Sequence, residues 1–137
     1  MIDIKELMVG NWVQTVSVIG AARVITIDSD LDPDGDCMPT VDTVKKRTRV
    51  HWIPEQISPI PITAEILKAN GWEERDKGTR YCKGNKSVLG GSVSLKKLEG
   101  KEKWIFSTIM GRITYVSFVH ELQNILHAMN TGEDIEL

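Results

Sequence analysis

A proline-rich stretch near the middle of the chain limits what this sequence can fold into more than any other feature. From Pro54 to Pro61 it reads PEQISPIP. Each proline lacks a backbone N–H and pushes the residue before it toward an extended conformation, so no long helix or central strand can cross this stretch. We therefore predict a β-rich N-terminal half, residues 1–60, and an α+β C-terminal half, residues 61–137. A chain of 137 residues can hold these as two small domains or as one compact domain with a shared core.

The N-terminal half contains three segments rich in Val, Ile and Thr, which is typical of β-strands. They span residues 11–19, 21–28 and 43–53. Gly20 predicts a hairpin between the first two, and we interpret the third, TVKKRTRVHWI, as one continuous strand. Three strands with one apolar face predict a small curved antiparallel sheet or partial barrel.

The C-terminal half begins with a helix signal. Thr63 is a good N-cap for a short helix that stops at Asn70-Gly71. Glycine-punctuated strands follow, as in an antiparallel meander, and an amphipathic helix is expected near the end. The expected strands are 72–75, 79–83, 87–95 and 103–110, and the final helix is 118–129. The predicted class is α+β, with a helix–β-meander–helix unit in this half.

The final helix contains a His-Glu pair that starts like H-E-x-x-H, the zinc signature of metalloproteases. The position of the second histidine is held by Asn124, and His127 lies two helical turns from His120, roughly 10 Å along the axis. The pattern therefore favours an amphipathic helix over a zinc site. His120, Asn124 and His127 are expected on its polar face, opposite an apolar stripe of Leu122, Ile125, Leu126 and Met129. No other catalytic signature is found, so we expect no catalytic residues and no enzyme.

An aspartate-rich segment, DSDLDPDGD, follows the second predicted strand. Within it, Asp30, Asp32 and Asp34 match the first half of a calcium-binding loop, in which alternate carboxylates converge on the ion. The second half does not match, because Val41 stands where the closing glutamate should be. Two interpretations stay open: a solvated turn that faces the basic residues after it, or a weak calcium site that stabilises the fold. No other cofactor is expected.

The third predicted strand carries several cations. If residues 43–53 form one strand, alternate side chains share a face at a spacing of about 6.6 Å, which suits a phosphate backbone. Trp12 and Trp52 would add base stacking if they are exposed. The alternative is a solvated face balanced by the acidic segment, with both tryptophans in the core. The candidate nucleic-acid-binding residues are Lys45, Arg47, Arg49 and His51.

Three further segments resemble a family of small uncharacterised proteins of gut anaerobic bacteria, their phages and their mobile elements. These are KELMVGNWV, ISPIPITAEILKANGW and YVSFVHELQNILHAMNTGEDIEL. The resemblance skips the acidic segment and residues 76–103. It implies a phage or mobile-element setting and a non-enzymatic accessory role, and it transfers no activity, ligand or site residue.

Charge, hydropathy and cysteine content narrow the class of protein. The net charge of −2 argues mildly against a dedicated non-specific nucleic-acid binder. No apolar run approaches the length that spans a bilayer, and the N-terminus does not read as a secretory signal. Cys37 and Cys82 lack metal-ligand spacing, which favours a reduced cytoplasmic chain. Because no apolar run is long enough to span a bilayer, no membrane partner is expected. The first expectation is an accessory protein that binds another protein; a nucleic-acid-binding module and a calcium-stabilised fold are the alternatives.

Overall fold

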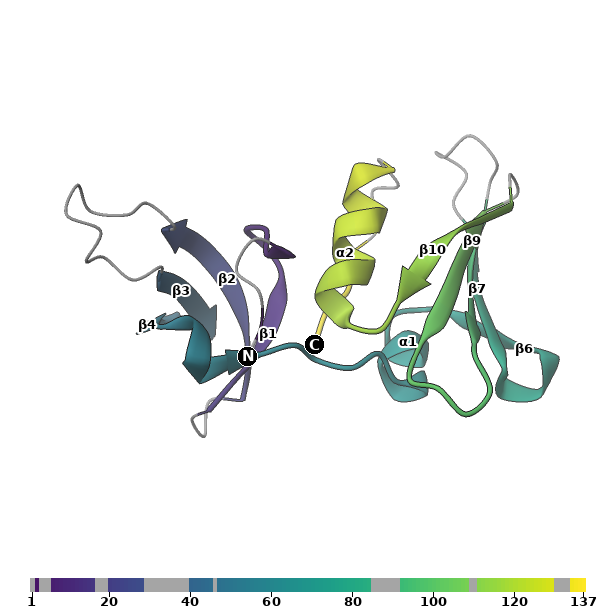
Figure 1. Ribbon diagram of the computed structural model, residues 1–137, viewed down its shortest axis with the longest axis horizontal. Coiled ribbons are helices and arrows are strands. Elements are labelled where there is room, and N and C mark those ends of the chain that lie inside the picture. The colour runs from purple at the N-terminus through teal and green to yellow at the C-terminus, as the bar shows by residue number, and fades with distance from the viewer. Residues whose placement is uncertain are drawn as a thin grey trace. The chain divides into compact units, whose positions relative to one another are not determined.

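The computed structural model of the protein describes residues 2, 6–16, 20–28, 40–45, 47–84, 92–108, 111–129 and 134–137. The fold is mostly β, with two antiparallel sheets and few helices, which agrees with the predicted α+β class in coarse terms (Figure 1). The chain divides into two compact units, Met1–Ile60 and Pro61–Leu137. We call them the N-terminal and C-terminal units. Among the helices of the described residues, none is long and apolar enough to cross a membrane.

The N-terminal unit is a five-stranded antiparallel sheet in the order β4-β3-β2-β1-β5. A 3-10 turn at Pro54–Gln56 leads from β4, at one edge of the sheet, to β5 at the other edge, where β5 pairs with β1. This turn is closed by Gln56, whose side-chain oxygen accepts a hydrogen bond from the backbone N–H of Ile53 at 3.1 Å. The strands are β1 Trp12–Thr15, β2 Ala21–Asp28, β3 Thr40–Lys45, β4 Thr48–Trp52 and β5 Ile57–Ser58.

One face of this sheet forms the core of the N-terminal unit. Alternate positions of the strands are buried, as expected for a half-exposed antiparallel sheet. Trp52 is among them, and its indole N–H donates a 2.8 Å hydrogen bond to the hydroxyl of buried Thr43, which satisfies its polar atom. Trp52 is therefore a core residue and is not available for base stacking. The buried cluster contains Ile2, Leu7, Val13, Val24, Val41, Trp52 and Ile57.

The prediction of one continuous strand over residues 43–53 is wrong. The structure has two strands there, which pair antiparallel from Val41 opposite Trp52 to Lys45 opposite Thr48. Only residues 46 and 47 connect them, and Arg47 takes a left-handed φ of 72°, as two-residue hairpin turns require. The turn was missed because KKRT lacks the Asn-Gly or Asp-Gly signal of such turns.

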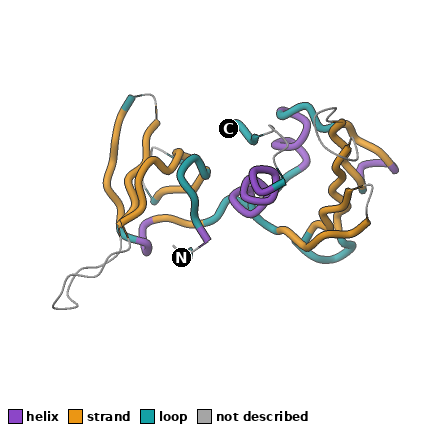
Figure 2. Tube along the Cα trace, turned by 90° about the horizontal axis from the view of Figure 1, so that it is seen from above, coloured by secondary structure: helices purple, strands orange, loops and turns teal. Residues whose placement is uncertain are grey.

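The C-terminal unit is an up-and-down sheet in the order β10-β9-β8-β7-β6, with two α-helices. Both helices lie on the same side of the sheet, and the other side is open (Figures 1 and 2). The prediction that Thr63 caps the first helix is confirmed, because its hydroxyl accepts a 3.3 Å hydrogen bond from the backbone of Ile66. The elements are α1 Ala64–Ala69, β6 Glu73–Arg75, a 3-10 turn at Asp76–Gly78, β7 Arg80–Gly84, β8 Ser92–Lys97, β9 Trp104–Thr108, β10 Gly111–Val116 and α2 Val119–Ala128.

The core of this unit lies between the sheet and the helices. Large side chains of alternate strand positions are buried there together with one face of α2. The last residues of the chain belong to it as well: Ile135 is fully buried, and the side-chain amide of Asn70 makes two hydrogen bonds, at 2.7 and 3.0 Å, to the backbone of Glu136. The main core residues are Leu67, Tyr81, Leu95, Trp104, Phe106, Val116, Val119, Leu122, Leu126 and Ile135.

Candidate nucleic-acid interface

The side of the N-terminal sheet that faces away from its core carries polar and aromatic side chains. Strand register aligns four of these residues in a row across β1 to β4, and three more in the next row. Residues directly opposite each other in an antiparallel pair share a face and are close enough to interact. We call this surface the N-terminal outer face. The first row is Trp12, Arg23, Val44 and Arg49, and the second is Thr26, Asp42 and His51.

The structure brings together two of the four predicted nucleic-acid-binding residues. Arg49 and His51 both lie on the N-terminal outer face, at alternate positions of β4. Lys45 does not join them, because it lies opposite Thr48, and Arg47 lies in the turn. The predicted single row of four cations is therefore wrong. The ammonium group of Lys45 instead reaches toward Gly20, where a Cβ atom would lie 3.8 Å from its Nζ.

Asp42 links the two predicted cations. Its Oδ2 accepts a 2.9 Å hydrogen bond from Arg49 Nε and a second, from Arg49 Nη2, while its Oδ1 lies 2.5 Å from His51 Nδ1. The hydrogen bonds from Arg49 and then from His51 hold the pKa of Asp42 below its ordinary value of 3.8. Asp42 is 14% exposed, whereas the side chains of Arg49 and His51 are 62% and 66% exposed. The cluster is thus a carboxylate covered by the exposed side chains of Arg49 and His51.

Arg23 is a cation of this face that the sequence analysis missed. Its guanidinium carbon lies 5.3 Å from the centroid of the Trp12 ring, within the range of a cation–π contact. Trp12 is half-buried on the outer face, in contrast to Trp52 in the core. Only the hairpin register, with Trp12 opposite Arg23, reveals this pair. The predicted Gly20 hairpin suggested that these strands pair, but not in which register.

The predicted calcium ligands Asp30, Asp32 and Asp34 lie outside the described residues. The described ends of their segment, Asp28 and Thr40, pair with each other. The carboxylate that contacts Arg49 and His51 is Asp42, within the sheet.

The His-Glu pair of α2 has a structural role. The Glu121 carboxylate accepts hydrogen bonds from the backbone N–H groups of Ser117 and Phe118, at 3.0 and 3.1 Å, which caps the N-terminus of the helix. The prediction that His120 lies on the polar face is wrong: it is 1% exposed, and its ring stacks on Phe118 with centroids 5.9 Å apart. The helix entry packs His120 inward, which a helical wheel cannot show. His127 is exposed.

The described residues hold neither a metal cluster nor a paired cysteine. No group of three or more His, Cys, Asp or Glu side chains among them is arranged to hold a metal ion. Cys82 is a free, half-buried thiol on β7, and Cys37 lies outside the described residues.

Two cavities lie among the described residues of the C-terminal unit, close to each other. One, of about 370 Å³, lies beside α1 and is lined by both Glu65 and Lys97, the latter with its Nζ 5.7 Å from the ring centroid of Trp104. The other, of about 340 Å³, shares Glu102 and Ser117 with the first. Because side chains of both charges line them, these cavities favour neither an anionic nor a cationic ligand.

No protein-family model, curated protein or solved structure matches this chain. The interpretation of the N-terminal outer face therefore rests on its own geometry.

Proposed function

We propose that this protein is a non-enzymatic nucleic-acid-binding protein of the cytoplasm and that its N-terminal outer face contacts the phosphate backbone. The observation that carries the proposal is the row across the sheet in which Arg23, stacked on Trp12, lies in line with the exposed Arg49. An aromatic ring beside well-separated guanidinium groups suits a ligand that has both flat bases and phosphates.

Arg49 retains donors for a phosphate. A guanidinium group has five N–H donors, and the two hydrogen bonds to Asp42 involve Nε and Nη2. The side chain is also 62% exposed, so a ligand can reach the donors that Asp42 does not use. Asp42 orients the guanidinium group and lowers the net charge of the cluster at the same time. We therefore expect modest affinity that weakens as the salt concentration rises.

The Trp12–Arg23 pair adds a flat surface beside these donors. The Arg23 guanidinium group lies over the Trp12 ring, and nucleic-acid bases stack on either kind of group. Such contacts are largely independent of base sequence. The proposed binding is accordingly directed at the backbone and the base faces, with little sequence preference.

A protein partner is the second candidate, as first expected from the sequence. Val9 and Val16 flank β1 and are 65% and 71% exposed, which is unusual for valine side chains. Binding through them would bury apolar surface and depend little on salt, whereas phosphate binding weakens steeply as salt rises. Salt dependence therefore separates the two candidates.

The test is fluorescence anisotropy of labelled single- and double-stranded 20-mers with the full chain, at low and at high salt. Replacing Arg23→Gln together with Arg49→Gln should weaken binding about tenfold or more. It should also lower the salt slope, the slope of log affinity against log salt concentration, by the amount expected for about two phosphate contacts. The matched control, Lys101→Gln with Lys103→Gln, removes the same charge from exposed residues of the C-terminal unit and should change affinity less than the first pair does. Absence of binding by the unmodified chain at low salt, or equal losses in the two double variants, would contradict the proposal.

A further inference from the structure

The open side of the C-terminal sheet is a second polar surface. It lies opposite α1 and α2, and strand alternation places on it mainly polar and charged residues, together with Ile105, which is buried (Figure 2). Register arranges them in two rows across all five strands, and we call this surface the C-terminal open face. One row is Arg75, Arg80, Lys96, Ile105 and Tyr115; the other is Glu73, Cys82, Ser94, Ser107 and Arg112.

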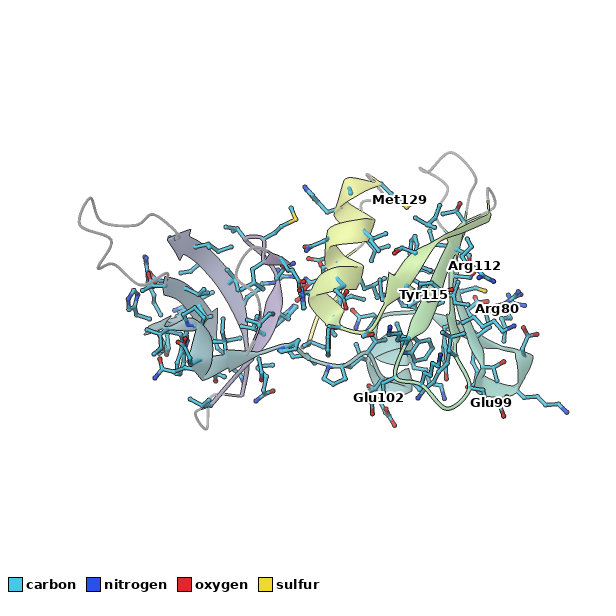
Figure 3. The ribbon with its side chains drawn as sticks, viewed as in Figure 1. Arg80, Glu99, Glu102, Arg112, Tyr115 and Met129 are labelled. Carbon is cyan, nitrogen blue, oxygen red and sulfur yellow. The ribbon has the colours of Figure 1, made fainter. Side chains whose placement is uncertain are left out.

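Cations predominate on this face. Arg75 pairs with Glu73 at 2.8 Å, and Arg80 lies 3.5 Å from Asp76 in the 3-10 turn that precedes β7. Lys96 and Arg112 form no ion pair with any carboxylate among the described residues. Figure 3 shows Arg80 and Arg112 on the side of the sheet away from α2. The face therefore offers positive charge to an anionic ligand at the middle strand and at the β10 edge.

An exposed aromatic residue lies at the β10 end of the first row. Tyr115 is 50% exposed, and its hydroxyl lies 3.5 Å from Arg112 Nη1, so the two side chains meet on the same face. Between Tyr115 and Lys96 lies only Ile105, which places these two strands about 10 Å apart. A ring that is half exposed and next to cations is a suitable surface for stacking a nucleic-acid base.

The edge of the sheet is poorly suited to pairing with another strand. β10 pairs with β9 and contains an irregularity between Arg112 and Thr114, which displaces one residue from the ladder. Bulges and charged side chains are the features with which proteins discourage strand addition at sheet edges. The face, rather than the edge, is therefore the surface available to a ligand.

We propose that the C-terminal open face binds single-stranded nucleic acid, with a base stacked on Tyr115 and phosphates held by Lys96 and Arg112. Single strands fit because stacking on a flat sheet requires bases that are not already paired and stacked in a duplex. The charge of the face is complementary to a polyanion: Arg112 lies beside Tyr115 on β10, and Lys96 lies two strands away in the row of Tyr115. This site lies in a different unit from the N-terminal outer face and uses none of its residues.

The experiment compares a fluorescein-labelled 15-residue oligothymidylate with a 15-base-pair duplex, each titrated with the full chain. Tyr115→Leu should weaken binding of the single strand about tenfold and change duplex affinity much less, while Tyr115→Phe keeps the ring and should retain binding. Lys96→Gln with Arg112→Gln should lower both the affinity and the salt slope for the single strand. Lys101→Gln with Lys103→Gln again serves as the charge-matched control.

The inference is overturned if Tyr115→Leu binds the single strand as tightly as the unmodified chain, or if the Lys96/Arg112 pair behaves like its control. The Arg23/Arg49 variant, titrated with the same probes, separates the two proposals. Loss of binding in that variant alone supports the N-terminal outer face and refutes the C-terminal open face. Loss of binding in the Lys96/Arg112 and Tyr115 variants alone supports the C-terminal open face and refutes the N-terminal outer face. Loss of binding in both sets of variants supports two sites.

Discussion

The two open sheet faces carry similar residues, but their basic side chains differ in which side chains they are paired with. On the N-terminal outer face, Arg49 and His51 share Asp42, and Arg23 lies on Trp12. On the C-terminal open face, Lys96 and Arg112 have no carboxylate partner among the described residues. The difference arises from register, which places Asp42 directly opposite His51 but places Lys96 between Arg80 and Ile105. Which charges are available to a ligand thus depends on strand pairing and not on composition.

The largest expected effect tests which side of the C-terminal sheet is the core. Phe106 is fully buried on the side of the helices, and Tyr115 is half exposed on the other side. Phe106→Ala should lower the free energy of unfolding by about 3–5 kcal/mol, because it leaves a cavity in a packed core. Tyr115→Leu should change it far less. Urea-induced unfolding at 25 °C measures both; similar losses in the two variants would mean that the assigned open face is in fact packed.

A smaller effect tests how far Asp42 limits the N-terminal outer face. Asp42→Asn removes a negative charge and frees the donors of Arg49 that the carboxylate engages. Affinity for labelled nucleic acid should rise severalfold at low salt, and the salt slope should become steeper. Glu73→Gln is the matched change on the C-terminal open face, where Lys96 and Arg112 do not depend on Glu73. Weaker binding after Asp42→Asn would show instead that the carboxylate is needed to orient Arg49.

The smallest effect concerns protonation of the same carboxylate. Hydrogen bonds from Arg49 and His51 lower the pKa of folded Asp42 below 3.8, the value expected in the unfolded chain. Its contribution to stability is therefore present above pH 3.8 and is lost as the pH falls through the lower pKa of the folded state. A carboxyl ¹³C NMR titration should give a midpoint for Asp42 below 3.8. A midpoint at or above that value would mean that the two hydrogen bonds do not persist in solution.

Local signals in the sequence were sufficient for several features of the fold. Thr63 before AEILKA predicted a helix N-cap because the hydroxyl acts within its own turn. The apolar spacing of α2 likewise predicted the burial of Leu122 and Leu126, although not that of His120. These features depend on residues a few positions apart, so no knowledge of the tertiary structure was needed.

The candidate sites depended on contacts that the sequence does not encode locally. Arg23 becomes part of the N-terminal outer face only when β1 and β2 pair in their observed register. Asp42 was not assigned to the candidate site because residues 43–53 were taken for one strand, which hid its position opposite His51. Tyr115 was missed because β10 itself was not predicted. A strand register or an unrecognised turn, and not the local sequence, determined which side chains meet.

The most direct test of the central claim is a ¹H–¹⁵N NMR titration of the full chain with the oligothymidylate, following the four tryptophan indole N–H signals. Trp12 lies on the N-terminal outer face under Arg23, whereas the indole of Trp52 is hydrogen-bonded to Thr43 in the core of the same unit. Binding at the outer face predicts a progressive shift of the Trp12 signal while the Trp52 signal changes little. An unchanged Trp12 signal at a concentration that saturates binding would contradict the proposed function.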